Sequence, residues 1–458
     1  MDVPAHATSY IEQAVAAARS KAPNFSPGYF NFVNEVLLLL NPPHVLPDQR
    51  EARLAFVMRW QQFTGPIVAK GLEDTALYVY HPLLSLNEVG GDPRPSHASS
   101  REEFFQFLQN RQQKWPGTLD ATSTHDTKRS EDVRARINVL SEIPGEWKEH
   151  LERWSTLNAG HKQQFNGHSA PDRNEEYFLY QTLLGVWPLE TEAQESLLER
   201  VQDHLIKATR EAMVHTRWTR PNQPHEDALK TFAARILAAE NRNFLDDFGQ
   251  FQRKVAYYGM INGLSQTLLK IAAPGVADFY QGSELWNLRL VDPDNRGPVD
   301  FQKRAAVFQQ IQNAGKSKDE LRDQLQNWPH GGIKMYLMWK ALCFRREHVD
   351  LFQQGEIVPL RSAGCHADHV VAFMRRTANS SVLVTVPRWL STVRSKPEGE
   401  PFNVDWCDTR VLLPPDSPQQ WKNILASAEL RALLSGGEPC VLAQDLFRDL
   451  PVAFLQSS

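Results

Sequence analysis

The chain has 458 residues, which at about 150 residues per domain predicts two to four domains. Its 50 Lys and Arg residues against 54 Asp and Glu residues give a formal net charge of −4, without the basic excess typical of proteins that bind nucleic acid or anionic membranes. No apolar run reaches the roughly 20 residues of a membrane span, and the N-terminus lacks a secretory signal pattern, so we expect a cytoplasmic protein with no nucleic-acid or membrane partner.

Helical patterns alternate with short apolar strands over residues 1 to about 300. Ser9 is expected to cap a first helix, because a serine side chain can accept a hydrogen bond from a free N–H group at a helix start. Asp48 is expected to cap a second helix in the same way. The apolar face of this second helix is expected to contain Leu54, Val57, Met58 and Phe63.

A helix–strand–helix order follows in the next segment. The helix at 101–115 should end at Pro116 and Gly117, because proline and glycine interrupt helices. A strand-like stretch at 118–124 comes next, and then a helix that Ser130 caps. This order is typical of an α/β barrel. Later helices are expected at 175–185, 194–215 and 244–270, with a strand at 276–280.

The last part of the chain changes character. Residues 302–350 are helical by pattern, and short strands follow at 369–375, 381–387, 440–443 and 452–455. We therefore predict an α/β fold, a partial TIM (β/α)8 barrel with a large helical insertion followed by a C-terminal β-sandwich domain. The expected parts are 1–130 with second-half barrel segments, 131–265 as mostly helical insertion, 266–335 with the last barrel strand and helix, and 336–458 as the β-rich domain.

The chain has four cysteines, Cys343, Cys365, Cys407 and Cys440. None forms a CxxC pair, and the histidines form no HExxH pair, so the spacing predicts no metal site and no redox dithiol. A disulfide framework is not expected at this low density. We expect four reduced thiols packed within the protein, and no cofactor.

The best local signal is STHDTKRSED at residues 123–132, where His125 and Asp126 lie between a predicted strand and a predicted helix. In a barrel this position is at the mouth, where catalytic groups project. A carboxylate there can stabilise an oxocarbenium-like transition state, and Lys128 and Arg129 would favour its ionised form. The alternative is an ordinary helix N-terminus, where Asp, Ser and Glu are common.

A second signal is GPIVAKGLEDTALY, which ends at Tyr78 and continues through NEVGGDP at 87–93. Lys70 beside Glu73 and Asp74 could bind a ligand rich in hydroxyl groups. The glycines match neither GxGxxG nor GxxxxGK[ST], so this is not a phosphate loop. The alternative is a surface turn with solvated charges.

A third signal is PGVADFYQGSEL at 274–285, followed by DPDNRGPVD at 292–300. The first string predicts a buried strand that feeds a loop. The second is a turn rich in carboxylates around one arginine, and it lacks the spacing of an EF-hand calcium loop. The alternatives are ordinary core for the first string and an ordinary turn for the second.

Together the three segments resemble the maltooligosyl trehalose synthase family of the alpha-amylase superfamily. The strings GPIVAKGLEDTALYVYHPLLSLNEVGGDP, STHDTKRSEDVRARI and PGVADFYQGSELWNLRLVDPDNRGPVD occur in the order of that family. The resemblance runs over essentially the whole chain. One departure is Gly297, where a second arginine is expected after Arg296.

The resemblance implies a TIM-barrel enzyme that converts the reducing-end α-1,4 linkage of a maltooligosaccharide into an α-1,1 linkage in trehalose biosynthesis. This is an intramolecular transferase of the isomerase class, a (1->4)-alpha-D-glucan 1-alpha-D-glucosylmutase. By the motif, Asp126 is a third catalytic carboxylate that stabilises the transition state, and His125 contacts the reacting sugar. The other expected substrate contacts are Lys70, Glu73, Asp74, Lys128, Arg129, Asp292, Asp294 and Arg296.

The chain departs from the superfamily in one further way. The nucleophile of the superfamily lies in an Arg-x-Asp segment and the acid/base Glu on the next strand, and both precede the His-Asp segment. Residues 1–125 contain neither. We therefore expect the C-terminal portion of the enzyme, inactive alone. Either a separate N-terminal half is its partner, or the chain is the product of a truncated reading frame. The alternatives are a glucan hydrolase of the same superfamily and a non-catalytic glucan-binding remnant.

Overall fold

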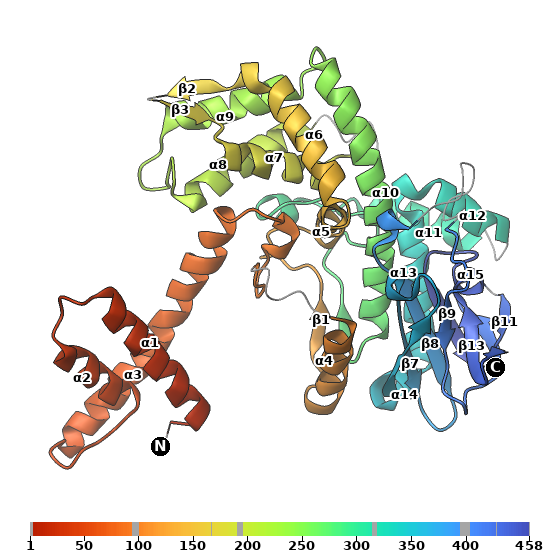
Figure 1. Ribbon diagram of the computed structural model, residues 1–458, viewed down its shortest axis with the longest axis horizontal. Coiled ribbons are helices and arrows are strands. Elements are labelled where there is room, and N and C mark those ends of the chain that lie inside the picture. Colours follow the sequence, from red (N-terminus) through yellow and green to blue (C-terminus); the bar gives the residue numbers. More distant parts are fainter. Residues whose placement is uncertain are drawn as a thin grey trace. The chain divides into compact units, whose positions relative to one another are not determined.

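The computed structural model of the protein describes residues 3–93, 100–165, 167–189, 196–313, 318–393, 404–426 and 428–457. The chain forms two compact units, Met1–Ala76 and Leu77–Ser458 (Figure 1). The boundaries expected after residues 130, 265 and 335 fall inside the second unit and stay predictions. Among the described helices, none combines the length and the apolar character that crossing a membrane requires.

The first unit is helical. Its elements are α1 (Ala5–Lys21), α2 (Pro27–Leu37), α3 (Pro47–Val68) and a wide helical turn at Ala69–Glu73. Two expected caps were wrong, because α1 begins directly after a proline and α3 begins at one, where the fixed φ of proline suits the first helical position. Helix α1 follows Pro4, with Ser9 inside it, and Asp48 lies in the first turn of α3 after Pro47.

The apolar face predicted for α3 is only partly buried. Val57 is buried, whereas the side chains of Met58 and Phe63 are 53% and 60% exposed. The described residues 3–76 contain no strand, so the expected alternation of helices and strands was wrong here. Helical periodicity thus predicted the helix correctly, but it did not predict which of its apolar side chains are buried.

The second unit begins with a helical part. Its helices are α4 (Arg101–Lys114), α5 (Glu131–Asn138), α6 (Pro144–Leu157), α7 (Arg173–Val186), α8 (Leu197–Ala212), α9 (Gln223–Ile236) and α10 (Arg242–Ala272). Helices α4 and α7 begin at capping boxes formed by Ser100 with Glu103 and Asp172 with Glu175. A hairpin of β2 (Gln163–Phe165) and β3 (His168–Ala170) was not predicted. Residues 194 and 195, where the helix now α8 was expected to begin, lie outside the described residues.

Helix α10 has 31 residues and joins two cores. Its first half places Phe244 and Phe248 against Trp154 of α6, at ring-centroid distances of 5.8 and 5.0 Å. Its second half places Leu264 and Leu268 in the core of the C-terminal part. A helix that is apolar on several faces must be covered on several sides. Helix α10 is covered by α6 along its first half and by the C-terminal core along its second half.

The C-terminal part begins with helices and ends with strands. The helices are α11 (Phe301–Asn313), α12 (Lys318–Gln326), α13 (Gly332–Glu347) and α14 (Val349–Gln354), and a short α15 (Ala443–Leu446) comes later. The strands are β5 (Glu356–Leu360), β6 (Ser362–Ala363), β7 (Val370–Arg376), β8 (Ser381–Pro387), β9 (Arg410–Leu412), β10 (Gln420–Asn423), β11 (Glu429–Arg431), β12 (Leu433–Ser435), β13 (Glu438–Leu442) and β14 (Ala453–Ser457).

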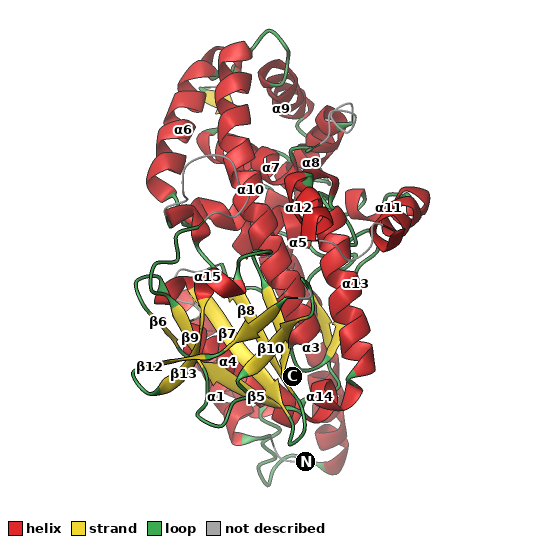
Figure 2. Ribbon diagram, turned by 90° about the vertical axis from the view of Figure 1, so that its right-hand side faces the viewer, coloured by secondary structure: helices red, strands yellow, loops and turns green. Residues whose placement is uncertain are grey.

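These strands form two antiparallel sheets, in the orders β11-β10-β14-β8-β7-β5 and β12-β13-β9-β6 (Figure 2). Strand β8 is buried along its whole length, as is nearly all of β7. Helices α10 and α14 pack against β8 and β7, and both sheets contribute to one apolar core. The predicted mixed α/β fold with a strand-rich C-terminal part is therefore confirmed at this level.

Candidate active-site loops

Two short parallel strands position the candidate site. Strand β1 (Leu119–Ala121) pairs with β4 (Val276–Asp278), with Leu119 opposite Val276. The carboxyl ends of parallel strands lie at the same edge of a sheet. The chain after β1 therefore meets the chain after β4, although about 150 residues of sequence separate them.

The first of these segments, which we call the His-Asp loop, comprises residues 123–130. Thr127 Oγ1 donates to the Thr124 carbonyl at 2.9 Å, and the Asp126 N–H donates to Thr124 Oγ1 at 3.2 Å. These bonds form a tight local turn. The side chains of His125 and Asp126 are exposed at its tip.

The second segment, which we call the Asp-rich loop, comprises residues 292–300. Asn295 Nδ2 donates to the His125 carbonyl at 3.0 Å. Just before this loop, the Arg289 carbonyl accepts from the Ser130 N–H at 3.0 Å. The structure thus brings the first and third signal motifs of the sequence analysis, 123–132 and 274–300, into direct contact.

Glu88, near the end of the second signal motif, connects that motif to the His-Asp loop. Its carboxylate accepts from the N–H groups of Lys128 and Arg129 at 2.7 and 3.2 Å, and from the Arg134 guanidinium at 2.9 Å. A carboxylate with two backbone donors and one charged donor holds a loop firmly, because such bonds are short and strong. Sequence reasoning quoted Glu88 within NEVGGDP but gave it no role.

Lys128 and Arg129 are buried, with exposures of 4% and 1%. Burial lowers the pKa of Arg129 to about 10, against the opposing effect of Tyr78 and Glu88. The Arg129 guanidinium lies 5.5 Å from the ring centre of Phe178 and donates to the Leu84 carbonyl. These side chains therefore contact protein groups, and their assignment as substrate contacts stays a prediction.

The residues of the Asp-rich loop have distinct surroundings. Asp294 accepts two hydrogen bonds from Arg200, at 2.9 and 2.8 Å, and one from Arg289 at 3.0 Å. Burial alone would raise the pKa of Asp294, but the Arg200 guanidinium outweighs it and holds the pKa below its usual value. Asp292 pairs with Lys207 at 2.6 Å, which lowers its pKa, whereas Arg296 is exposed. The Asp294 carboxylate therefore accepts hydrogen bonds from the Arg200 and Arg289 side chains and holds the Asp-rich loop against them.

Gly297 stands where a second arginine was expected. A Cβ atom at this position would lie 2.8 Å from a terminal nitrogen of Arg289. The Arg289 side chain therefore occupies the space that a side chain at 297 would enter. A guanidinium group therefore does lie beside position 297, but Arg289 supplies it.

Lys70, Glu73 and Asp74 lie in the first unit, in and just after the wide helical turn. Lys70 Nζ pairs with Asp74 at 2.5 Å, with the Lys70 side chain largely exposed. The role of these three residues as substrate contacts stays a prediction.

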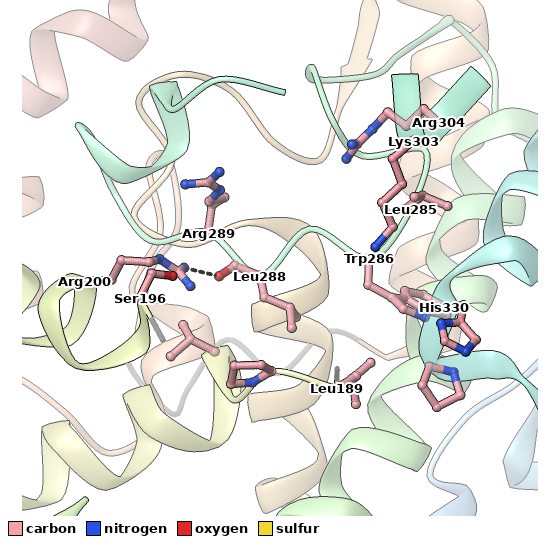
Figure 3. Close-up of a pocket in the computed structure, with 13 residues that line it drawn as sticks. Leu189, Ser196, Arg200, Leu285, Trp286, Leu288, Arg289, Lys303, Arg304 and His330 are labelled. Carbon is pink, nitrogen blue, oxygen red and sulfur yellow. Dashed lines mark hydrogen bonds between the residues drawn. The ribbon is translucent and has the colours of Figure 1, made fainter. Parts of the chain in front are cut away.

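A pocket of about 290 Å³ lies beside Arg289 (Figure 3). Its lining is rich in cationic side chains around Trp286, and Figure 3 shows Arg200, Arg289, Lys303 and Arg304 among them. Arg200 also donates to the Leu288 carbonyl at 2.6 Å. Sequence reasoning missed this pocket, because α8 supplies Arg200 from a segment without any motif.

A buried ionic cluster lies directly behind the His-Asp loop. Lys334 Nζ, with 0% exposure, pairs with Glu131 Oε1 at 2.7 Å and Asp132 Oδ2 at 2.8 Å. Lys270 pairs with the other Glu131 oxygen at 3.3 Å. Asp132 also accepts from the Asn287 N–H at 2.8 Å, which ties the cluster to the segment after β4. The sequence marks Glu131 and Asp132 within the motif, but nothing in it indicates Lys270 or Lys334 as partners.

This cluster predicts a pH dependence of stability. Burial would raise the pKa of Glu131, but Lys334 and Lys270 outweigh it and lower the pKa to about 2 from 4.5. A carboxyl group with a depressed folded-state pKa stabilises the fold above its unfolded pKa, and this contribution is lost as the pH falls through the folded value. We expect Glu131→Gln to flatten the loss of stability between pH about 4.5 and 2, measured by urea unfolding at each pH. An unchanged acid slope in this variant would contradict the assignment.

Comparisons with known proteins identify the relatives of the chain. The chain is 36% identical over 398 residues to proteins named as maltooligosyl trehalose synthases in two strains of Mycobacterium tuberculosis, CDC 1551 / Oshkosh and H37Rv. Each match covers 87% of this chain and 45% of the relative. None of the protein-family models searched matches the chain.

Solved structures give the same result. Maltooligosyltrehalose synthase from Arthrobacter ramosus superposes with a TM-score of 0.78 at 29% identity, covering 98% of this chain and 51% of that one. A hypothetical maltooligosyl trehalose synthase of Sulfolobus tokodaii gives a TM-score of 0.66 at 29% identity, covering 93% and 53%. The chain is therefore homologous to the maltooligosyl trehalose synthases over most of its length, and it spans about half the length of the curated relatives it matches.

Proposed function

We propose that the chain supplies one part of the active site of a maltooligosyl trehalose synthase. In this proposal Asp126 is the carboxylate that stabilises the transition state, and His125 beside it contacts the reacting sugar. The remaining proposed substrate contacts are Lys70, Glu73, Asp74, Lys128, Arg129, Asp292, Asp294 and Arg296.

One observation carries the proposal. The His-Asp loop and the Asp-rich loop leave the same edge of a parallel strand pair and are joined by the bond from Asn295 to the His125 carbonyl. Glu88 fixes the base of the His-Asp loop, so that the exposed Asp126 carboxylate stands on a rigid support. Groups that act on a transition state need such support, because their placement must precede the reaction.

The proposed reaction is an intramolecular transfer with retention. A carboxylate nucleophile bonds to the anomeric carbon as the bond to O4 of the terminal glucose breaks, and the acid/base protonates that O4. The acid/base then takes the proton of the anomeric hydroxyl of the released glucose, which attacks the glycosyl-enzyme and frees the carboxylate. This forms an α-1,1 linkage and removes the reducing end. A negative charge at Asp126 would stabilise the oxocarbenium-like transition states of both steps.

We place the nucleophile and the acid/base outside these 458 residues, in a preceding part of the same polypeptide or in a second chain. The exposed strand pair supports this: Leu119 and Val276 are 66% and 51% exposed, although parallel sheets are usually covered on both faces. In this proposal β1 and β4 are strands of a partial barrel, and the two C-terminal sheets form a sandwich.

The test is an assay with maltopentaose that follows reducing ends. We expect the chain alone to leave them unchanged, and a mixture with a polypeptide carrying the remaining half of the synthase to remove them. New reducing ends in the mixture would indicate a glucan hydrolase instead. Binding without conversion in the mixture would indicate a glucan-binding remnant, and conversion by the chain alone would overturn the placement of the nucleophile.

A further inference from the structure

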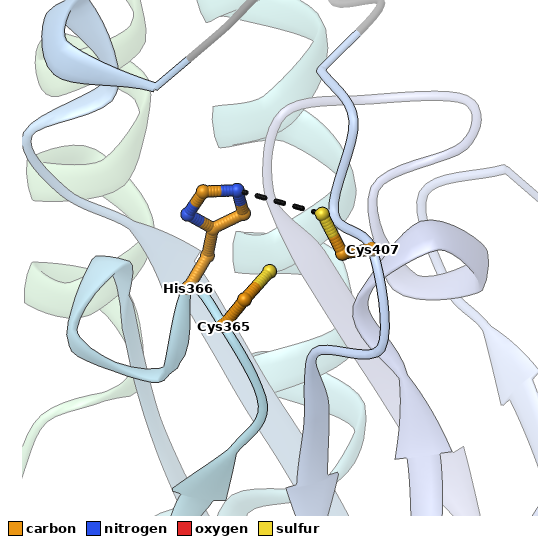
Figure 4. Close-up of side chains that lie close together, drawn as sticks. All are labelled: Cys365, His366 and Cys407. Atoms are coloured by element: carbon orange, nitrogen blue, oxygen red, sulfur yellow. Dashed lines mark hydrogen bonds between the residues drawn. The ribbon is translucent and has the colours of Figure 1, made fainter.

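Three side chains with metal-ligating atoms meet in the strand-rich C-terminal part, outside the loops described above (Figure 4). The ligand atoms of Cys365, His366 and Cys407 all lie within 4.8 Å of one another, and Cys407 Sγ is 3.9 Å from His366 Nε2. Cys365 and Cys407 are exposed, so the expectation of four packed thiols was wrong for these two. Their separation in the sequence hides the cluster, since no short motif contains both.

The first of the two loops that carry these residues is held by bonds that do not involve sulfur. The Cys365 N–H donates to Asp408 Oδ1 at 2.9 Å, and the His366 N–H donates to Thr409 Oγ1 at 3.0 Å. Gly364 has φ +106°, and a Cβ there would lie 2.6 Å from Thr409 Cα. The absence of a side chain at Gly364 therefore permits the close approach of the two loops. The adjoining strands β6 and β9 are paired, which keeps the loops together.

The second loop is anchored on the other side of the cluster. Trp406 is buried, and its ring lies 4.8 Å from the ring of Phe447. The next residue, Cys407, has φ +48°, a conformation uncommon for a residue other than glycine. Its N–H donates to Asp405 Oδ1 at 3.1 Å. The backbone thus holds the Cys407 thiol toward Cys365 and His366 at the surface.

The distances suit a tetrahedral ion. Bonds of about 2.3 Å to sulfur and 2.0–2.1 Å to nitrogen place the ligand atoms of a tetrahedral Zn²⁺ roughly 3.6 Å apart for S···N and 3.8 Å for S···S. The observed 3.9 Å between Cys407 Sγ and His366 Nε2 is within a few tenths of an ångström of this value. Closing the cluster around an ion therefore needs only small side-chain movements.

The charges nearby also favour a cation. The carboxylate of Asp408 accepts a hydrogen bond from the Cys365 N–H at 2.9 Å, and the carboxylate of Asp405 accepts one from the Cys407 N–H at 3.1 Å. Two sulfur atoms and two carboxylates thus gather at one place on the surface. Thiolate and imidazole ligands select Zn²⁺ and similar ions over Mg²⁺ or Ca²⁺.

We propose that Cys365, His366 and Cys407 form a binding site for one thiophilic divalent cation such as Zn²⁺. Three protein ligands leave a fourth position for water or an added ligand. Such an ion would connect the loop after β6 to the loop before β9. This site is independent of the proposed glucan chemistry.

The experiment uses Co²⁺ as a spectroscopic probe on the whole 458-residue chain, after reduction and removal of metal with a chelator. We expect one Co²⁺ per chain, with the near-ultraviolet charge-transfer absorption of thiolate ligands, and displacement of the probe by Zn²⁺. Cys365→Ser, Cys407→Ser and His366→Ala should each weaken binding by roughly a hundredfold or more, since even groups that only support a ligand contribute tenfold to a hundredfold. Cys343→Ser and His168→Ala are the matched controls, because Cys343 and the exposed His168 lie outside the cluster, and both variants should bind as the wild type does.

Alkylation of the wild-type chain gives a second measurement that needs no variant. Zn²⁺ should protect Cys365 and Cys407 from alkylation and leave the rate at Cys343 unchanged, as read by peptide mass spectrometry. Absence of the thiolate band, or binding that survives Cys365→Ser, would overturn the proposal. A disulfide between Cys365 and Cys407 whose reduction yields no metal binding would also overturn it.

Discussion

Replacing Lys334 with methionine is expected to lower the free energy of unfolding of the second unit by about 3–5 kcal/mol. Lys334 lies at 0% exposure between Glu131 and Asp132, whose carboxylates are 2.7 and 2.8 Å from its Nζ atom. Methionine fills a similar volume but leaves two buried carboxylates with Lys270 as the remaining cation of the cluster. Urea unfolding followed by tryptophan fluorescence measures the change, because Trp286 lies 5.7 Å from the Lys334 ammonium.

The matched control is Lys148→Met. Lys148 is 74% exposed and pairs with Glu152 one helical turn away, at 3.8 Å. Exposed pairs of this kind contribute about 0.3–0.5 kcal/mol, so this variant should unfold nearly as the wild type does. If the two variants lost equal stability, the buried cluster would not have the role assigned to it.

Replacing Asp126 with asparagine is expected to reduce conversion of maltopentaose by the mixture of the chain and its complementing half by about 10²- to 10³-fold. The substitution retains the shape of the side chain and the backbone bond from the Asp126 N–H to Thr124 Oγ1, but it removes the negative charge. Since a charge that acts in the transition state affects the rate more than substrate binding, kcat should fall while KM changes little. The measurement is steady-state loss of reducing ends.

Asp203→Asn is the control for this prediction, because Asp203 is exposed on α8 and stands in none of the motifs. It should leave the rate of the mixture unchanged. Thermal unfolding of the Asp126→Asn chain should match the wild type, since the Asp126 side chain is exposed at the tip of its loop. A rate near the wild-type value for Asp126→Asn would remove this residue from the proposed chemistry.

The sequence by itself determined the elements whose signals are local. Helix α4 ends at Lys114, just before the predicted stop at Pro116, and strand β8 occupies the predicted 381–387. Capping, proline geometry and residue periodicity act over three or four positions, so they can be identified without knowing the rest of the fold. The motif strings were likewise sufficient to indicate the family that the comparisons support.

Contacts between distant segments were decided only by the tertiary structure. Ser130 stands at the start of α5, yet its hydroxyl donates to the Asn287 carbonyl rather than capping the helix. Lys334 reaches Glu131 across 203 positions of sequence, and Cys407 meets His366 across 41. No local pattern encodes such pairs, because their energy depends on burial and on the approach of whole elements that the chain forms only when it folds.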